Sequence, residues 1–267
     1  MAISVSSVKT DLFTMDYFRF GTGPRTMVIL PGLSIQSVIP SAELVAQAYQ
    51  SFARDYTVYV FDRRKDLPPS YSIGEMAKDT VIAMHTLGLT DIYLFGASQG
   101  GMIAQVIAIR FPGLVHKLVL GSSACHIGEE TPEAVAQWIL LARQRKAKAL
   151  CLDFAEKVYP EDLFRSNIHS FEAMADGVTE NDLRRFVTLA EGTAGFSTRA
   201  DLHRVVCPVY VLGSKDDKVL GGNAGSGIIK ALGFSPEHRL YLYEGYGHAC
   251  YDTAPDFKDR MRDFFRS

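Results

Sequence analysis

Short apolar runs that end at turn residues alternate with helical patterns along most of this chain, and this alternation limits its possible folds more than any other feature. The runs are rich in β-branched or aromatic side chains and occupy residues 27–30, 57–61, 92–95, 117–120, 209–212 and 239–243. Near-continuous apolar runs of this length are typical of strands that are buried on both faces of a parallel sheet. The helical patterns between them occupy residues 42–52, 73–87, 101–111 and 226–232. The sequence therefore predicts an α/β fold with right-handed crossovers.

Two segments depart from this alternation. Residues 1–20 alternate polar with apolar side chains, which predicts an antiparallel hairpin at one edge of the sheet. Between residues 123 and 200 the strand pattern stops and helical patterns follow one another, the first with Thr131 expected as its N-cap. We therefore interpret residues 1–122 and 201–267 as one α/β core, and residues 123–200 as a helical insertion that forms a lid over one end of the sheet.

Composition and charge exclude several classes of protein. Hydrophobic residues make up 47% of the 267 residues and charged residues 22%, so the chain has ample material for a core and is not globally disordered. A formal net charge of −2 predicts no binding to nucleic acid or to an anionic membrane. The first residues lack a signal-peptide pattern, and no run approaches the ~18 apolar residues of a membrane-spanning helix.

The four cysteines are far apart and form no C-x-x-C pair. This spacing argues against a disulfide scaffold or a zinc ribbon, and it favours free thiols in a reducing compartment. We therefore expect a cytoplasmic protein without a metal site. The cysteines are Cys125, Cys151, Cys207 and Cys250.

A glycine-rich turn around Ser98 carries the strongest chemical signal. Residues 96–100 match the pattern G-x-S-x-G, which is weak alone, but here a strand-like run precedes the turn and a helical pattern follows it. A sharp turn from strand to helix lifts its serine above the sheet edge, close to the free N–H groups of the helix N-terminus. Ser98 is therefore the candidate nucleophile, and the alternative is an ordinary serine in a glycine-rich turn.

A serine hydroxyl needs a base, and the base needs an acid that orients it. Among the seven histidines, His248 follows a strand-like run, lies among glycines and precedes a C-terminal helical pattern, so it is the candidate base. The run at residues 209–212 is followed by two adjacent carboxylates, Asp216 and Asp217. We expect Asp216 to be the acid, with Asp217 as the first alternative and Glu244 as the second.

Two backbone N–H groups are candidates for binding the negative oxygen that forms when a serine attacks a carbonyl group. One belongs to Gln99, directly after the candidate nucleophile, and the other to Leu33, in the loop that follows the run at residues 27–30. Gly32 permits the turn that aims the Leu33 N–H group inward. The alternative is that Pro31 and Gly32 form an ordinary turn between a strand and a helix.

In combination these segments resemble the α/β-hydrolase superfamily over essentially the whole chain. The resemblance implies an eight-stranded, mostly parallel sheet flanked by helices, a helical lid formed by the insertion, and no cofactor. Because residue 98 is serine, the dehalogenase and epoxide-hydrolase branches, which have aspartate there, are disfavoured. The residues that carry the resemblance are 31–33, 96–101, 111–115, 208–216 and 247–248.

Two positions differ from the family pattern. Pro31 stands where a histidine is common before the glycine of the oxyanion loop, and residues 63–69 replace the usual glycine-rich turn after Asp62. Neither belongs to the expected catalytic residues. The sequence assigns no substrate-binding residue; Trp138 is a candidate either for lining the pocket or for packing the lid on the core.

We therefore expect a serine hydrolase that acts on a small molecule, namely a small or medium acyl substrate and most simply a carboxylic ester, through a covalent acyl-enzyme. The same residues serve C–C bond hydrolases, lactonases, amidases, acyltransferases and perhydrolases. A ligand receptor with this fold and negligible turnover is an alternative from another class. A glycine-rich segment at residues 221–227 lacks the spacing of a nucleotide-binding loop.

Overall fold

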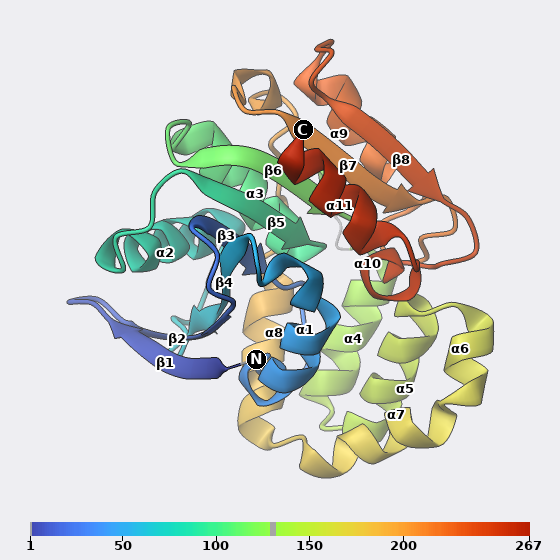
Figure 1. Ribbon diagram of the computed structural model, residues 1–267. Coiled ribbons are helices and arrows are strands. Elements are labelled where there is room, and N and C mark those ends of the chain that lie inside the picture. Colours follow the sequence, from blue (N-terminus) through green and yellow to red (C-terminus); the bar gives the residue numbers. More distant parts are fainter. Residues whose placement is uncertain (1, 129–131) are drawn as a thin grey trace.

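The computed structural model describes residues 2–128 and 132–267, and an eight-stranded sheet runs through it (Figure 1). The strands lie in the order β1-β2-β4-β3-β5-β6-β7-β8; β1 and β2 pair antiparallel to their neighbours, and the other pairs are parallel. This arrangement confirms the predicted α/β fold and its antiparallel edge hairpin. The strands are β1 (Ile3–Lys9), β2 (Thr14–Phe20), β3 (Arg25–Leu30), β4 (Tyr56–Arg64), β5 (Ile92–Ala97), β6 (Val115–Gly121), β7 (Val209–Ser214) and β8 (Arg239–Tyr243).

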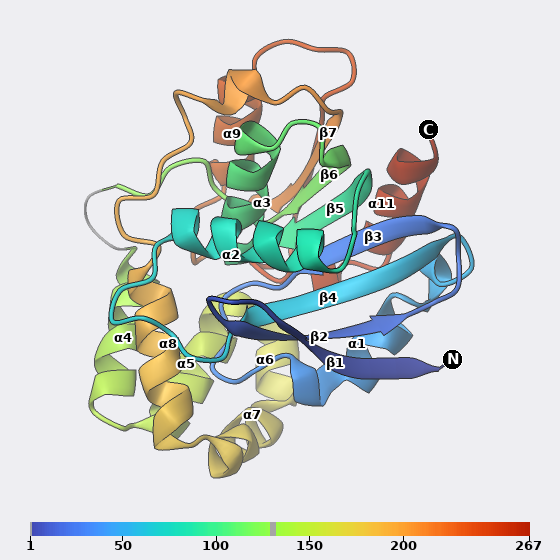
Figure 2. The same cartoon turned by 90° about the vertical axis from the view of Figure 1, so that its left-hand side faces the viewer.

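Helices cover both faces of the sheet (Figure 2). The helices on one face are α2 (Ile73–Thr86), α3 (Gln99–Arg110) and α9 (Ala224–Leu232), and those on the other are α1 (Ala42–Ala48), α10 (Cys250–Thr253) and α11 (Phe257–Arg266). Each face has its own apolar core, and every residue of β5 is buried. The near-continuous apolar runs of the sequence therefore reflect strands that are covered on both sides. Single turns of 3-10 helix occupy Ile39–Ser41, Gln50–Phe52, Ala175–Gly177 and Leu202–Arg204.

The chain between β6 and β7 forms a group of helices below the sheet in the view of Figure 1. Side chains of Trp138, Leu150 and Phe186 form an apolar core within this group and are almost inaccessible to solvent. Thr131, expected as the N-cap of the first of these helices, lies outside the described residues. The helices are α4 (Glu133–Arg143), α5 (Ala147–Val158), α6 (Glu161–Ser166), α7 (Ile168–Met174) and α8 (Glu180–Glu191).

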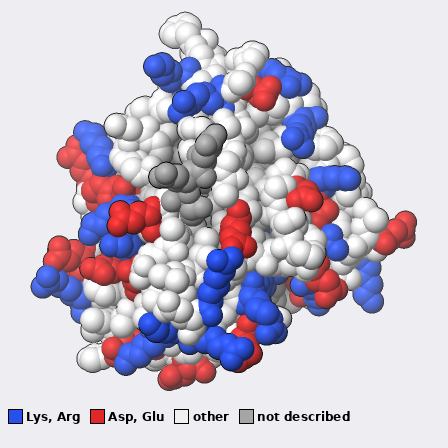
Figure 3. All heavy atoms as spheres, turned by 180° about the vertical axis from the view of Figure 1, so that it is seen from behind, with Lys and Arg blue, Asp and Glu red and all other residues white. Residues whose placement is uncertain are grey.

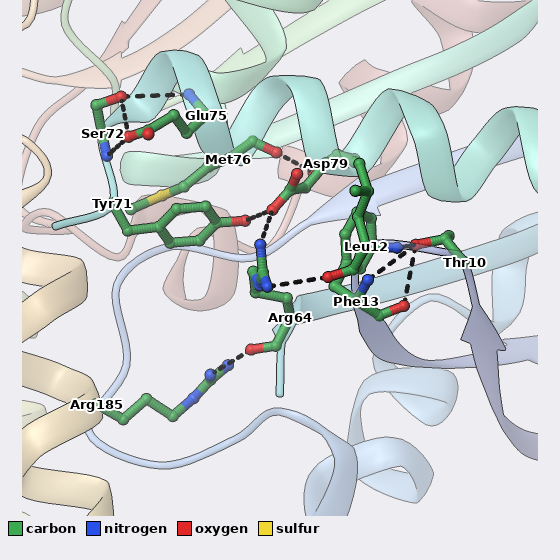
Figure 4. A network of polar contacts seen from close by, with 11 residues as sticks. Thr10, Leu12, Phe13, Arg64, Tyr71, Ser72, Glu75, Met76, Asp79 and Arg185 are labelled. Atoms are coloured by element: carbon green, nitrogen blue, oxygen red, sulfur yellow. Dashed lines mark hydrogen bonds and ion pairs between the residues drawn. The ribbon is translucent and has the colours of Figure 1, made fainter. Parts of the chain in front are cut away.

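Arginine side chains fasten this helical insertion to the core (Figure 4). Arg185 of α8 donates from Nη1 to the main-chain carbonyl of Arg64, at the end of β4, over 3.0 Å. The Arg64 guanidinium donates to Leu12 O at 3.2 Å and to Asp79 Oδ2 at 3.4 Å. Asp79 Oδ2 also accepts from the Tyr71 hydroxyl at 2.8 Å. One connected set of polar contacts thus holds the insertion to β4, to α2 and to the loop between β1 and β2.

Basic and acidic side chains are interspersed over the face of the molecule seen in Figure 3. Within residues 2–128 and 132–267, no helix combines the length and the apolar composition that a membrane crossing requires. All four cysteines are buried and carry free thiols.

Candidate active site

Ser98 lies at the sharp turn between β5 and α3. Its backbone has φ 50° and ψ −117°, a conformation that is costly for a residue with a side chain. Neighbouring residues hold this conformation: the Ser98 N–H donates to Gly121 O at 2.8 Å, and the Ser98 carbonyl accepts from Ser123 Oγ at 2.9 Å. Hydrogen bonds to the end of β6 therefore maintain the strained turn that carries the hydroxyl.

Glycines on either side of Ser98 are required because two main chains pass too closely there for a side chain. A Cβ atom at Gly96 would lie 2.4 Å from Gly100 O, and a Cβ atom at Gly100 would lie 2.0 Å from Leu30 O. Contacts this short between carbon and a carbonyl oxygen do not occur in folded proteins. The G-x-S-x-G pattern is therefore explained by the close packing of α3 against β3 and β5.

Replacing Gly100 by alanine should destabilise the protein, because the clash is with backbone and no side-chain rotation relieves it. We expect the free energy of unfolding to fall by roughly 3 kcal/mol, the upper range for overpacking a core. A urea titration measures this change. Gly113→Ala is the matched control, since a Cβ atom there meets nothing within 4 Å. Equal effects of the two substitutions would contradict the packing explanation.

The imidazole of His248 lies between Ser98 and a carboxylate. His248 Nε2 is 2.9 Å from Ser98 Oγ, and His248 Nδ1 is 2.8 Å from Asp217 Oδ2. The histidine is only 2% exposed. A carboxylate at Nδ1 favours the tautomer that carries its proton there, so Nε2 is left to accept the proton of the serine hydroxyl.

The prediction that Asp216 is the partner of His248 is wrong, because the carboxylate in contact with the ring belongs to Asp217. Asp216 instead accepts hydrogen bonds from the N–H groups of Gly245 and Gly247, each at 3.0 Å. It thereby fixes the loop between β8 and α10 that carries the histidine. The two adjacent acids thus have different partners, and only Asp217 contacts the imidazole.

The environment of Asp217 keeps its carboxylate ionised. Burial by itself raises the pKa of this group, but the facing His248 ring and the N–H groups of Val219 and Leu220 outweigh burial, so the pKa is lowered from its ordinary value. Both N–H groups donate to Asp217 Oδ1, at 2.8 and 2.9 Å. One carboxylate oxygen is thus held by the backbone, and the other is free to hold the imidazole.

The loop after β3 passes directly beside Ser98. A Cβ atom at Gly32 would lie 3.2 Å from Ser98 Cβ, so this position also favours glycine. Leu33 and Gln99 line the same cavity as Ser98. Within the described ranges the N–H groups of these two residues donate no hydrogen bond. Gln99 is the first residue of α3, and the first N–H groups of a helix have no partner within the helix. Residues with free N–H groups thus line the same cavity as the serine.

Arg63 is a functional candidate that the sequence reasoning missed. Its Nη2 donates to Pro31 O at 2.8 Å and to Gln99 Oε1 at 3.3 Å, and Gln99 Nε2 donates to Leu189 O of α8 at 2.7 Å. Burial lowers the pKa of Arg63 to about 10, which still leaves the guanidinium charged at neutral pH. The side chain thus connects both segments that supply the free N–H groups. It stands in a polar run, which gives no sign that an arginine there is buried.

Two adjacent cavities adjoin this group of residues. The smaller cavity, of about 30 Å³, is lined by Ser98 and His248 among others. The larger cavity, of about 420 Å³, is lined in part by the loop after β3. Trp138 lines the smaller cavity and also packs in the apolar core of the insertion. The insertion side chains that line the smaller cavity include Val135, Trp138, Phe154 and Val158.

Other candidate sites add nothing to this group. In the described part of the chain, no cluster of three or more histidine, cysteine, aspartate or glutamate residues is arranged to hold a metal ion. The glycine-rich segment at residues 221–227 leads into α9, and Gly225 lets this helix approach β7, since a Cβ atom there would lie 3.3 Å from Val211 Cγ1. The segment therefore has a packing role.

Comparison with known proteins gives one consistent result. The alpha/beta hydrolase family profile matches residues 27–257. The chain is 27% identical to the putative carbamate hydrolase RutD of Cronobacter sakazakii, over 77% of this chain and 78% of that protein. It is 26% identical to the human serine hydrolase BPHL, over 98% of this chain and 87% of that protein.

A solved structure agrees with these relatives at the level of the fold. The crystal structure of MGS-M2, an alpha/beta hydrolase enzyme from a Medee basin deep-sea metagenome library, matches 98% of both chains with a TM-score of 0.83 and 17% identity. The family profile covers most of the chain, and the relatives are named as hydrolases. The protein therefore belongs to the alpha/beta hydrolase family and is an enzyme of the hydrolase type.

Proposed function

We propose that this enzyme is a serine hydrolase in which Ser98 is the nucleophile, His248 the general base and Asp217 the acid that orients the base. The observation that carries the proposal is the unbroken line of hydrogen bonds from Ser98 Oγ through the imidazole to Asp217, at 2.9 and 2.8 Å. A neutral imidazole that is held by a carboxylate at Nδ1 directs its Nε2 lone pair at the hydroxyl, as in serine hydrolases on unrelated folds.

The reaction proceeds in two halves. Ser98 Oγ attacks the acyl carbon while its proton passes to His248 Nε2, and Asp217 stabilises the imidazolium that forms. The N–H groups of Leu33 and Gln99 bind the resulting oxyanion. The imidazolium then gives its proton to the departing oxygen, which leaves an acyl-enzyme. Water attacks this ester with His248 as base, so that the acid is released and Ser98 regains its proton.

The small cavity beside Ser98 supports a short acyl group. Its volume of about 30 Å³ holds one or two groups of the size of a water molecule. Large side chains such as Trp138 and Phe154 close it from the insertion, which we propose to act as a lid. The substrate is therefore most simply an ester of a short carboxylic acid, and carbamate, a similarly compact acyl group that appears in a relative's name, is the second candidate.

A series of p-nitrophenyl esters from acetate to decanoate tests this function. We expect kcat/KM to be highest for acetate or propionate and to fall by roughly 10-fold or more at octanoate, because each added methylene has no space. Phe154→Ala should shift the optimum toward longer chains. Maximal activity on decanoate would contradict the assignment, and a single acylation without further release would indicate a ligand receptor instead of an enzyme.

Other reactions of the same catalytic residues are alternative outcomes of substrate tests. Lactones, amides and C–C bonds are cleaved by the same nucleophile and base, and acyl transfer or perhydrolysis replaces water by another acceptor. The cytoplasmic location stays a prediction from the sequence, supported by four free and buried thiols.

Arg63→Met should lower kcat by roughly 10- to 100-fold with a smaller effect on KM, because the loop that carries the Leu33 N–H loses its anchor at Pro31 O. Steady-state kinetics with p-nitrophenyl acetate measures both constants. Arg63→Lys should restore part of kcat, since an ammonium group also donates to a carbonyl. Arg19→Met, on the exposed side of β2, is the control. Unchanged kcat in Arg63→Met would refute this positioning role.

A further inference from the structure

The larger cavity extends the candidate active site. The loop after β3 and helix α1 line one side of it, and α5 and α7 line the other. Leu33, Phe154, Val158 and Tyr251 line both cavities and thus form their common boundary. Because the smaller cavity has room only for a short acyl group, a larger leaving group must extend past this boundary.

Asp252 of α10 supplies the only carboxylate among the described residues that line the larger cavity. Within the described chain its oxygens form no hydrogen bond or ion pair, although the side chain is accessible to water. Loss of solvation on the protein side of the carboxylate raises the pKa of Asp252, and the charge of Lys258 offsets this only in part. A carboxylate in this position is stabilised by a cation that binds from the cavity.

Three tyrosines line the cavity together with this carboxylate. Burial raises the pKa of Tyr49, Tyr159 and Tyr251, and the negative charge of Asp252 raises it further. The face of a tyrosine ring attracts cations. The cavity therefore offers an ammonium group both a hydrogen-bond acceptor and aromatic surfaces.

The charge of Lys258 lowers the pKa of Asp252, but the ammonium group of this lysine donates its hydrogen bond elsewhere. Its Nζ donates to Tyr251 O at 2.7 Å and lies 5.4 Å from the centre of the Tyr49 ring. It does not line the cavity, and no ion pair joins it to Asp252. The cavity side of the carboxylate is thus open to a second cation.

We propose that the larger cavity binds the leaving group of the substrate and that Asp252 selects leaving groups that carry a protonated amine. This inference rests on the proposed serine hydrolase function, and it assigns the substrate class as short-chain esters of amino alcohols. In this arrangement the ammonium group donates to Asp252 between the tyrosine rings, while the ester carbonyl lies at Ser98.

Two esters of nearly identical shape test the proposal. 2-(Dimethylamino)ethyl acetate carries a positive charge at pH 7, and 3-methylbutyl acetate has a neutral carbon in the same place. We expect the wild-type enzyme to favour the ammonium ester by about 10-fold in kcat/KM, as for one charge-assisted hydrogen bond. Asp252→Asn should abolish this preference. It should leave kcat/KM for the neutral ester within about twofold, because asparagine has nearly the same size as aspartate and the neutral ester forms no charged contact with residue 252.

Two further variants sharpen the result. Asp259→Asn removes an exposed carboxylate of α11 outside the cavity and should keep the full preference. Lys258→Met removes the opposing charge and should increase the preference for the ammonium ester. If both esters react equally in the wild-type enzyme, or if Asp252→Asn retains the preference, the proposal is overturned.

A binding measurement separates this proposal from the catalytic one. Ser98→Ala is titrated with each intact ester, and saturation-transfer NMR gives the two dissociation constants without turnover. The subsite is supported if Ser98→Ala binds the ammonium ester more tightly than the neutral one and the Ser98→Ala, Asp252→Asn double variant does not. This result would support the subsite even if the wild-type enzyme hydrolyses neither ester. Turnover of both esters with equal binding would leave the hydrolase function intact and refute the subsite.

Discussion

Ser98→Ala should lower kcat for p-nitrophenyl acetate by about 10⁶-fold, the loss that removal of a serine nucleophile causes in comparable triads. Without the hydroxyl no acyl-enzyme forms, and the remaining rate comes only from water acting in a site that still binds an oxyanion. Steady-state kinetics at saturating ester measures the change. A fluorophosphonate probe gives a second measurement, because it should label the wild-type enzyme once and the variant not at all.

Controls make this result specific. Ser166→Ala removes an exposed serine at the end of α6 and should keep wild-type activity and labelling. Ser98→Cys preserves the position of the nucleophile and should still be acylated by the activated ester. Activity of Ser98→Ala above about one per cent of wild type would place the nucleophile elsewhere, since it far exceeds the residual rate of such variants.

Asp217→Asn should lower kcat by about 10⁴-fold, because an amide at this position favours the wrong tautomer of His248 and no longer stabilises the imidazolium. Asp216→Asn is a closely matched comparison, since the two acids are adjacent. It should cost only about 10-fold, because Asp216 acts through the loop that carries the histidine and an amide oxygen still accepts one of its hydrogen bonds. Kinetics of the two variants side by side decides the assignment, and a larger loss at Asp216 would reverse it.

The pH dependence of stability provides an independent check on Asp217. Its pKa is lowered in the folded protein, so its contribution to stability is present above the ordinary aspartate pKa of about 4 and is lost as the pH falls through the lowered value. The difference in the free energy of unfolding between wild type and Asp217→Asn should therefore be largest near neutral pH and shrink below about pH 4. Urea titrations across this range measure it, and a constant difference would speak against an ionised partner of His248.

The extent of β4 illustrates where sequence reasoning ends. The apolar run predicts a strand at residues 57–61, whereas the observed strand is Tyr56–Arg64. Its last residues are charged, and a charged pattern normally indicates a loop. Arg63 is nevertheless buried, because Pro31 O and the Gln99 side chain accept its hydrogen bonds. These partners come from distant parts of the chain, so no local pattern announces them.

The pair Asp216 and Asp217 shows the same limit within the site. The sequence places both acids after β7 and the histidine after β8, and parallel strands bring these ends together at one sheet edge. Which of the two acids faces the imidazole depends on the turn of the backbone at that edge. It also depends on which N–H groups are within reach of the second acid. Asp216 accepts hydrogen bonds from the N–H groups of Gly245 and Gly247, whereas Asp217 contacts the imidazole.

The sequence by itself determined the α/β sheet, the edge hairpin and the sharp turn at Ser98, because buried strands, amphipathic helices and tight glycine turns each leave a local pattern. Only the tertiary structure decided which carboxylate meets His248, that Arg63 braces the loop after β3, and that Asp252 faces a cavity between core and insertion. These features depend on the direction of single side chains and on contacts between segments far apart in the chain, which local spacing does not encode.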